Sequence, residues 1–163
     1  MMKRRRQEHK TDYRLRRNIL KSGKPRIVFR KTNSYVLGQM VESISAQDKV
    51  LVQAHSRELL RLGWDAAFAG SLKSLPACYL TGLLLGKRIK EKYGEQEVVL
   101  DIGLLRNKPK SRIYAFVKGI VDVKIPLKVH EDIFPLEERI KGSHMKKDVA
   151  SLLHKISKNI EAE

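Results

Sequence analysis

The chain has 163 residues, of which 34 are Lys or Arg and 18 are Asp or Glu, so its formal net charge at pH 7 is +16. This length suits one domain with appendages, and a hydrophobic share of 42% is enough for one core. The single cysteine, Cys78, excludes an intrachain disulfide and a four-cysteine zinc site, and it favours a reducing, intracellular compartment.

Positive charge is concentrated in the first 31 residues, where thirteen Lys or Arg stand against Glu8 and Asp12. Such a segment neutralises phosphates and releases their counterions, so nucleic acid is the first partner to consider. An anionic membrane surface and a role in solubility alone are the alternatives. The basic start is followed by polar residues where an apolar segment would be needed, so neither a secretion signal nor a membrane span is expected.

Residues 1–10 lack an apolar period, which predicts a mobile arm that becomes ordered when it binds phosphates. A short helix is predicted over residues 12–21, with Thr11 as its N-cap. Arg14 and Arg17 are three residues apart, so they share a helix face and present a row of cations to a phosphate track. A solvated charged face is the alternative interpretation.

Three runs of β-favouring residues follow, and they predict antiparallel strands. In the first run, Arg26 and Arg30 point to one face, whereas Ile27 and Phe29 point to the other face and into a core. One face of the sheet is therefore predicted to be basic and open. The three runs cover residues 26–30, 35–41 and 50–55.

The connection between the first two strands is rich in hydrogen-bonding groups. It reads Lys31-Thr32-Asn33-Ser34, and Tyr35 follows it. A tyrosine ring at this place suits stacking on an unpaired base, and the polar turn suits irregular RNA. The alternative is an ordinary hairpin with Tyr35 in a minor core.

Helical signals dominate the second half of the chain. Residues 57–74 predict a long loop pinned by Trp64, and a helix is expected between Ser74 and Gly94. Gly82 and Gly86 within that helix are interpreted as allowing close approach to the strands. A parallel strand over residues 97–102, a helix over residues 112–123 and a short helical turn over residues 135–141 follow.

The last segment predicts an amphipathic helix whose apolar face needs a surface to cover it. Packing on its own domain and docking on a partner are equally compatible with the sequence. The apolar positions are Met145, Val149, Leu152, Leu153, Ile156 and Ile160.

Catalytic chemistry has little support in the sequence. The five histidines form no helical pair at metal-ligand spacing. Asp101, at the carboxyl end of a predicted strand, is the one carboxylate placed as in a metal-dependent nuclease, but no partner carboxylate is identified. We therefore expect no enzyme activity, no metal and no cofactor.

Seven short strings occur in an order that resembles one family. They cover about residues 9–145, and together they are similar to the universal 5S rRNA-binding protein of the large ribosomal subunit, in its archaeal and eukaryotic branch. The strings are Lys10-Thr11-Asp12-Tyr13, Gly23-Lys24-Pro25-Arg26, Arg30-Lys31-Thr32-Asn33, Tyr79-Leu80-Thr81-Gly82-Leu83-Leu84-Leu85, Leu100-Asp101-Ile102-Gly103-Leu104, Lys118-Gly119-Ile120-Val121-Asp122 and Ile133-Phe134-Pro135.

The resemblance implies an α/β fold in which three antiparallel strands are extended by one parallel strand into a mixed sheet with helices packed on it. It also implies a cytoplasmic, ribosome-bound protein that attaches 5S rRNA to the large-subunit rRNA in the central protuberance. Neighbouring ribosomal proteins are expected partners, whereas a membrane and a small-molecule substrate are not. We divide the chain into a basic arm and helix (1–23), an α/β core (24–123) and a C-terminal extension (124–163).

The candidate RNA-binding residues come from five places. The arm, the helix and the hairpin are carried over from the resemblance, polar and aromatic positions lie on the strands, and a basic loop follows Asp101. A sequence-independent nucleic-acid-binding protein is the main alternative. The candidates are Arg4, Arg5, Arg6, Arg14, Arg17, Lys24, Arg26, Arg30, Lys31, Thr32, Asn33, Tyr35, Gln39, His55, Arg106, Lys108, Lys110 and Arg112.

Overall fold

A computed structural model describes residues 4–44, 47–65, 70–142 and 149–162. Its centre is a mixed sheet with the strand order β3-β2-β1-β4. The first three strands are antiparallel neighbours and β4 runs parallel to β1, so the predicted fold class is confirmed. The strands are β1 (Arg26–Lys31), β2 (Val36–Ile44), β3 (Gln47–His55) and β4 (Val99–Asp101).

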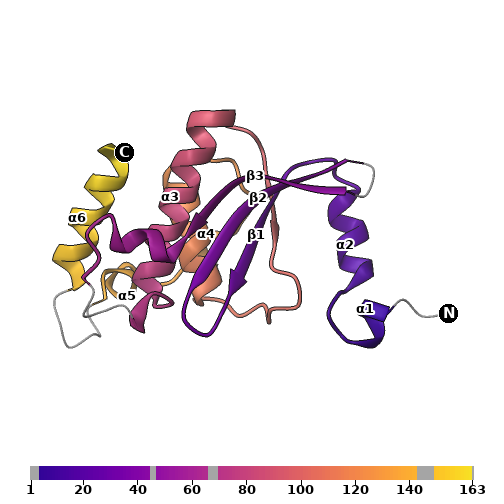
Figure 1. Cartoon of the computed structure of the whole chain (residues 1–163), viewed down its shortest axis with the longest axis horizontal. Helices are drawn as coiled ribbons and strands as arrows, with labels where there is room; N and C mark the ends of the chain where they lie inside the picture. Colours follow the sequence, from indigo (N-terminus) through magenta and orange to yellow (C-terminus); the bar gives the residue numbers. More distant parts are fainter. Residues whose placement is uncertain (1–3, 45–46, 66–69, 143–148, 163) are drawn as a thin grey trace.

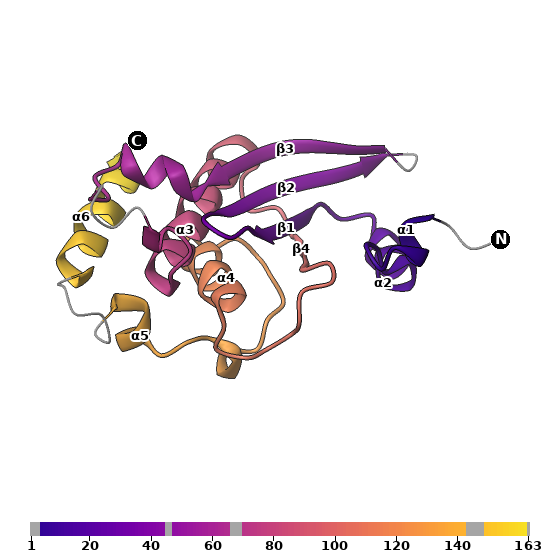
Figure 2. The same ribbon diagram turned by 60° about the horizontal axis from the view of Figure 1, so that its bottom comes forward.

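The hairpin of β2 and β3 is longer than the sequence predicted. Pairing continues from Leu37↔His55 to Ile44↔Gln47, and an irregularity of register lies at Met40 and Val41. Figure 2 shows this hairpin extending away from the helices, toward the end of the molecule where the N-terminal segment lies. The strands β2 and β3 therefore extend toward the basic end of the chain (Figure 2).

The core lies on one face of the sheet, under α3 (Leu75–Tyr93) and α4 (Arg112–Asp122) (Figure 1). Ile27 and Phe29 point into this core as the alternation predicted, and the rings of Phe29 and Phe116 lie 5.1 Å apart. Cys78 is also fully buried, and burial raises the pKa of its thiol to about 12. The thiol is therefore protonated at neutral pH, as expected for a structural cysteine.

Glycines let α3 and α4 cross at backbone distance. A Cβ atom on Gly82 would lie 2.0 Å from the carbonyl oxygen of Phe116, and one on Gly119 would lie 2.3 Å from the carbonyl oxygen of Tyr79. Gly86 likewise faces α4, at Ile120. The prediction that these α3 glycines approach the strands is therefore wrong, because the element they admit is the neighbouring helix.

The N-terminal segment holds a helical turn, α1 (Arg4–Gln7), and a helix, α2 (Tyr13–Leu20). The expectation of an unstructured arm is wrong for the described residues from Arg4 onward, because Glu8 pairs with Arg4 at 3.3 Å and with Lys10 at 2.9 Å. The cap also differs from the prediction. Asp12, and not Thr11, accepts the first free amides of α2 and is the N-cap.

The segment predicted as a long loop begins with a short 3-10 helix, η1 (Ser56–Leu60). Leu59 and Trp64 are buried in the core, so the predicted anchoring role of Trp64 is confirmed. Ser56 is also buried, and its hydroxyl accepts a hydrogen bond from the backbone of Val36 at 3.0 Å. The start of this segment is thus tied to the sheet.

The C-terminal segment holds η3 (Glu131–Ile133), α5 (Glu137–Lys141) and α6 (Val149–Ala162), so the predicted helical turn and final helix are confirmed. The final helix packs on its own domain, where Ile156 and Ile160 are fully buried. Lys87 of α3 donates hydrogen bonds to the last backbone carbonyls of α6. Met145 lies outside the described residues.

The two ends of the chain lie at opposite ends of the molecule, with α1 and α2 on one side and α6 on the other (Figure 1). None of the helices in the described ranges is long and apolar enough to cross a membrane.

Candidate nucleic-acid-binding surface

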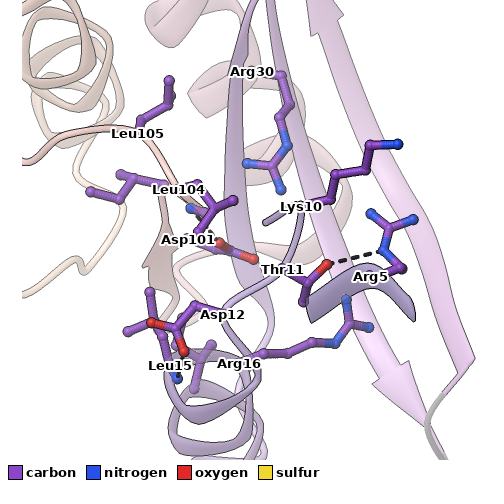
Figure 3. Close-up of a pocket in the computed structure, with 13 residues that line it drawn as sticks. Arg5, Lys10, Thr11, Asp12, Leu15, Arg16, Arg30, Asp101, Leu104 and Leu105 are labelled. Atoms are coloured by element: carbon purple, nitrogen blue, oxygen red, sulfur yellow. Dashed lines mark hydrogen bonds between the residues drawn. The ribbon is translucent and has the colours of Figure 1, made fainter. Parts of the chain in front are cut away.

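The N-terminal segment encloses a cavity together with β1 and the loop that follows β4. This cavity, which we call the arm pocket, has a volume of about 360 Å³ and is lined by the cations Arg5, Lys10, Arg16 and Arg30. Figure 3 shows Arg5 and Lys10 on one side of the arm pocket and Leu105 on the other. Side chains that are far apart in sequence thus form one basic site.

Two carboxylates also line the arm pocket, and both are engaged by the backbone. Asp12 caps α2, accepting from the amides of Arg14 at 2.9 Å and Leu15 at 3.1 Å. Asp101 accepts a hydrogen bond from the amide of Gly103 at 2.9 Å. Within the described part of the chain, no group of three or more His, Cys, Asp or Glu side chains is placed to hold a metal ion. Through its hydrogen bond from the amide of Gly103, Asp101 has a structural role in this fold.

The prediction of a basic, open sheet face is wrong at Arg26, which is only 4% exposed. Its guanidinium lies 2.6 Å from Asp48 Oδ2 and 3.6 Å from Asp101 Oδ2. Arg16 of α2 reaches the same Asp48 oxygen at 2.8 Å, so the N-terminal helix is tied to the sheet through this carboxylate. Arg26 thus serves the fold and has no surface for RNA.

The pKa of Asp48 reflects this arrangement. Burial acts to raise the pKa, but hydrogen bonds from Ser43, Arg16 and Arg26 outweigh it and hold the pKa below its usual range. The Asp48 carboxylate is therefore charged at neutral pH and remains available to both guanidinium groups.

At the other end of β1, Tyr35 is half-buried within a small aromatic and cationic cluster. Its ring centroid lies 5.3 Å from that of His55, and the Arg57 guanidinium lies 4.6 Å above the tyrosine ring. Arg57 also donates a hydrogen bond to the Tyr35 hydroxyl at 2.9 Å. We call Tyr35, His55 and Arg57 the Tyr35 cluster. It combines stacking surfaces with a cation, which suits contact with unpaired bases.

His55 has a structural duty inside the Tyr35 cluster. Its Nδ1 accepts from the amide of Arg57 at 3.0 Å, and Glu58 accepts from the amide of His55 at 2.7 Å, which together cap η1. Because Nδ1 acts as an acceptor, the neutral ring carries its proton on Nε2. That nitrogen is the one left to donate to a nucleic acid.

Some of the other predicted residues of the hairpin make hydrogen bonds within the protein, and others are exposed to solvent. The Thr32 hydroxyl accepts from the amide of Tyr35 at 2.9 Å, and it closes the turn. Gln39 donates weakly to Gln53 across the strands, at 3.4 Å. Lys31 and Asn33 are exposed, although the backbone carbonyl of Asn33 accepts a hydrogen bond from Lys73. Thr32 is exposed as well, so Lys31, Thr32 and Asn33 offer surface to a ligand, whereas Gln39 is half-buried.

A second, larger hollow of about 750 Å³ lies beside the loop after β4, and we call it the loop groove. It collects the four loop residues predicted from the sequence and adds one cation from the end of β1 and one from α5. Its cations are Lys31, Arg106, Lys108, Lys110, Arg112 and Arg139.

The remaining predicted cations lie on the N-terminal segment and just before β1. Arg6, Arg14 and Arg17 are exposed on α1 and α2, and Arg4 is 86% exposed despite its contact with Glu8. Lys24 is partly engaged, because its ammonium lies 2.6 Å from Glu97 and lowers the pKa of that carboxyl. The arm residues are therefore the freest to follow a phosphate backbone.

Sequence reasoning missed several residues that the structure places in these sites. Arg57 follows the predicted strand at the start of a predicted loop, and Arg139 lies on a short helix far along the chain. Arg16 does not share the spacing of Arg14 and Arg17, so it is not among the predicted contacts. In the structure, Arg16 lines the arm pocket together with Leu15 and Ile19. The sequence signal for Arg16 would have been its place on a helical projection, where it lies on the same side of α2 as Ile19, three residues away.

Comparison with known proteins places the chain among ribosomal proteins. Residues 1–98 match the family described as ribosomal large subunit proteins 60S L5 and 50S L18. The chain is 43% identical to the large ribosomal subunit protein uL18 of Methanoculleus marisnigri over an alignment of 160 residues. This alignment covers 98% of this chain and 88% of that protein.

Two further archaeal relatives are similar over a shorter part of the chain. The uL18 protein of Korarchaeum cryptofilum is 44% identical over 142 residues, covering 87% of this chain and 70% of that protein. The uL18 protein of Haloarcula marismortui is 41% identical over 142 residues, covering 87% and 73% respectively. The similarity to the uL18 protein of Methanoculleus marisnigri thus extends over nearly the whole chain.

Proposed function

Because the chain belongs to the family of large-subunit ribosomal proteins 60S L5 and 50S L18, in its archaeal branch, we propose that it binds 5S rRNA and helps to attach it to the large-subunit rRNA in the central protuberance. Membership of the family makes the chain a cytoplasmic, ribosome-bound structural protein that associates with rRNA, and not an enzyme. What remains to be argued is which RNA it holds and with which residues.

The observation that carries the proposal is the convergence of cations in the arm pocket. Arg5, Lys10 and Arg16 from the N-terminal segment meet Arg30 of β1 around one cavity, beside the exposed Arg14 and Arg17. Guanidinium groups pair with phosphate oxygens bidentately and also stack on bases, which an ammonium group cannot do. The arm and β1 therefore fit a folded RNA backbone.

Base contacts are assigned to the other end of β1. The Tyr35 cluster offers an aromatic face and the His55 Nε2 donor, and the exposed Asn33 side chain offers both a donor and an acceptor. Protein–RNA recognition of irregular RNA uses such groups on unstacked bases and 2′-hydroxyls. Phosphate contacts from the arm and base contacts from the hairpin then act together on one RNA.

Neighbouring ribosomal proteins are proposed to contact the C-terminal extension. Leu136, immediately before α5, is 62% exposed, and it borders a hollow that also includes Leu127, Val129 and Phe134. An exposed apolar patch of this kind is typical of a protein interface. The apolar side of the final helix, α6, is buried in the core of this protein, so the exposed patch around Leu136 and not α6 is the proposed contact.

The proposal is tested by a gel-shift titration of the full chain with 5S rRNA, a tRNA of similar length and a duplex DNA, at several salt concentrations. We expect a preference for 5S rRNA of about a hundredfold or more that survives physiological salt, because the ratio of specific to non-specific binding and not the absolute affinity defines specificity. If the duplex DNA displaces 5S rRNA at equal nucleotide concentration, the protein is instead a sequence-independent binder of nucleic acids.

The role of the arm is tested by deleting residues 1–10. The affinity for 5S rRNA is expected to fall, and the slope of log K against log salt to flatten by about 0.7 to 0.9 for each phosphate that the variant no longer binds. The double variant Lys155→Ala and Lys158→Ala, on the exposed side of α6, is the control for the removal of positive charge. An unchanged slope in the deletion variant would place the phosphate-binding residues elsewhere.

A further inference from the structure

A carboxylate stands directly beside the Tyr35 cluster, although the cluster is proposed to contact RNA. Glu58 is the third residue of η1 and follows Arg57 in the chain, and its side chain is partly exposed. A negative charge next to a polyanion weakens binding unless another group compensates it. Glu58 therefore calls for an explanation other than contact with the RNA.

Both oxygens of the Glu58 carboxylate are engaged within the protein. Oε1 accepts a hydrogen bond from the amide of His55 at 2.7 Å, and Oε2 lies 2.7 Å from the guanidinium of Arg88 on α3. Another nitrogen of Arg88 donates to the backbone carbonyl of Gln53 in β3 at 3.0 Å. Arg88 thus compensates the charge of Glu58 and joins α3 to both β3 and η1.

Glu58 acts on the Tyr35 cluster through His55. Glu58 holds the amide of His55, while Nδ1 of the same histidine accepts from the amide of Arg57 at 3.0 Å, and the two contacts form a reciprocal capping box. This contact at Nδ1 selects the neutral ring that carries its proton on Nε2. Glu58 therefore helps to determine which group the histidine presents to a ligand.

The other two members of the cluster depend on the same turn of chain. Arg57 lies within η1, and its guanidinium is placed 4.6 Å above the Tyr35 ring while it donates to the tyrosine hydroxyl. Leu59, two residues further along η1, is fully buried in the core. Because η1 is fixed by Leu59 and by the Glu58 contacts, the cluster is ordered before a ligand binds, and less conformational entropy is lost on binding.

We propose that Glu58, held in place by Arg88, is a positioning residue that orders the Tyr35 cluster for contact with unpaired bases. The inference rests on the proposed function, because the RNA contacts themselves belong to Tyr35, His55 and Arg57. Glu58 makes no contact with the RNA, and its effect is to fix an N–H donor of His55 toward the ligand. The cluster then selects acceptor groups of bases or riboses.

The first test uses the sign of a change in affinity. Glu58→Ala removes a negative charge beside an RNA-binding surface, so charge alone predicts tighter binding to 5S rRNA. The positioning role predicts the opposite, a loss of affinity of about fivefold or more at every salt concentration. Glu91→Ala, which removes a carboxylate that pairs with Lys87 on α3, is the matched control and should bind no more weakly than the wild type. Wild-type or tighter binding by Glu58→Ala overturns the proposal.

A double-mutant cycle with Arg57→Ala separates positioning from a general loss of structure. If Glu58 acts through the cluster, its removal from the Arg57→Ala variant costs less than about half of what it costs in the wild type, whereas additive losses overturn the proposal. Thermal unfolding of each full-length variant, followed by circular dichroism, shows whether it is folded under the binding conditions. Glu58→Gln, which keeps an acceptor for the His55 amide but loses the charge facing Arg88, takes the place of Glu58→Ala if the alanine variant is unfolded, and it too should bind more weakly.

The His55 ring is observed by ¹⁵N NMR in the absence of RNA, so this second readout does not depend on the proposed function. At about pH 8.5, where imidazole side chains are neutral, the wild type should show the Nε2–H tautomer and Glu58→Ala a measurable share of the other tautomer. An unchanged tautomer in Glu58→Ala overturns the positioning role and leaves the proposed function intact. A changed tautomer, together with equal binding of 5S rRNA and tRNA by the wild type, supports the positioning role and contradicts the proposed function.

Discussion

The buried guanidinium of Arg26 lies 2.6 Å from Asp48 Oδ2, near the tip of the long hairpin. Arg16 of α2 binds the same oxygen, so one carboxylate joins the N-terminal helix, β1 and β3. A charged side chain that the sequence predicted to face RNA is used here to hold α2 on the sheet. The pair therefore links the stability of the fold to the geometry of the arm pocket.

Asp48→Asn is expected to lower the free energy of unfolding by about 2 kcal/mol, because it leaves the buried Arg26 charge without its nearest partner. Urea denaturation at pH 7 measures the change. Glu91→Gln, which removes an exposed carboxylate paired with Lys87 on α3, is the control and should change stability by less than about 0.5 kcal/mol. Equal effects of the two substitutions would contradict the role assigned to Asp48.

The lowered pKa of Asp48 predicts a pH dependence of stability. A carboxyl group whose pKa is lower in the folded state stabilises the fold in full above its unfolded pKa of about 4, and it loses this contribution as pH falls through the folded pKa. The stability difference between the wild type and Asp48→Asn should therefore shrink as pH is lowered below about 4. Urea denaturation of both proteins from pH 7 to pH 3 tests this, and a constant difference would contradict it.

Much of the fold follows from residue patterns that act locally. The alternation of Ile27 and Phe29, the buried apolar stripe of α4 and the start of α3 directly after its N-cap, Ser74, each reflect a geometry that a short stretch of chain imposes on itself. The ends of β2 and β3 were harder to predict from the sequence, because a hairpin extends as far as its two strands form backbone hydrogen bonds with each other. Residues 42–44 and 47–49 are mostly polar and carry no hydrophobic alternation to indicate that they pair.

The site was predicted less completely, since it depends on contacts between distant segments. Exposed cations such as Arg14 and Lys108 follow from charge density alone, and the structure leaves them exposed. Arg26 could not be distinguished from Arg30 by strand alternation, because both lie on the same face. Only the position of Asp48 across the hairpin shows that one of them is buried in an ion pair.

Gly82→Ala is predicted to destabilise the protein by about 3 kcal/mol or more. Its new Cβ would lie 2.0 Å from a backbone oxygen of α4, and a backbone atom within a helix cannot move aside as a flexible side chain can. Gly70→Ala is the control, since nothing lies within 4 Å of a Cβ at that position. Thermal and urea unfolding of both variants measure the effect. Near-wild-type stability of Gly82→Ala would show that the helices can separate at little cost.

Arg57→Ala is predicted to weaken binding to 5S rRNA by about 1 to 2 kcal/mol, which is more than the removal of one positive charge explains. The guanidinium lies 4.6 Å above the Tyr35 ring and donates to its hydroxyl, so the two side chains present one stacked surface. Arg61→Ala removes the same charge from an exposed position at the end of η1 and is the matched control.

The salt dependence of these two variants separates stacking from charge. Removing a cation that binds a phosphate flattens the slope of log K against log salt, whereas removing a stacked surface lowers affinity at every salt concentration alike. Arg57→Ala should therefore shift the whole curve downward, and Arg57→Lys should recover little of the affinity because an ammonium group lacks a planar face. Full recovery by lysine would show that Arg57 acts as a point charge, and that the Tyr35 cluster does not stack on RNA bases as a unit.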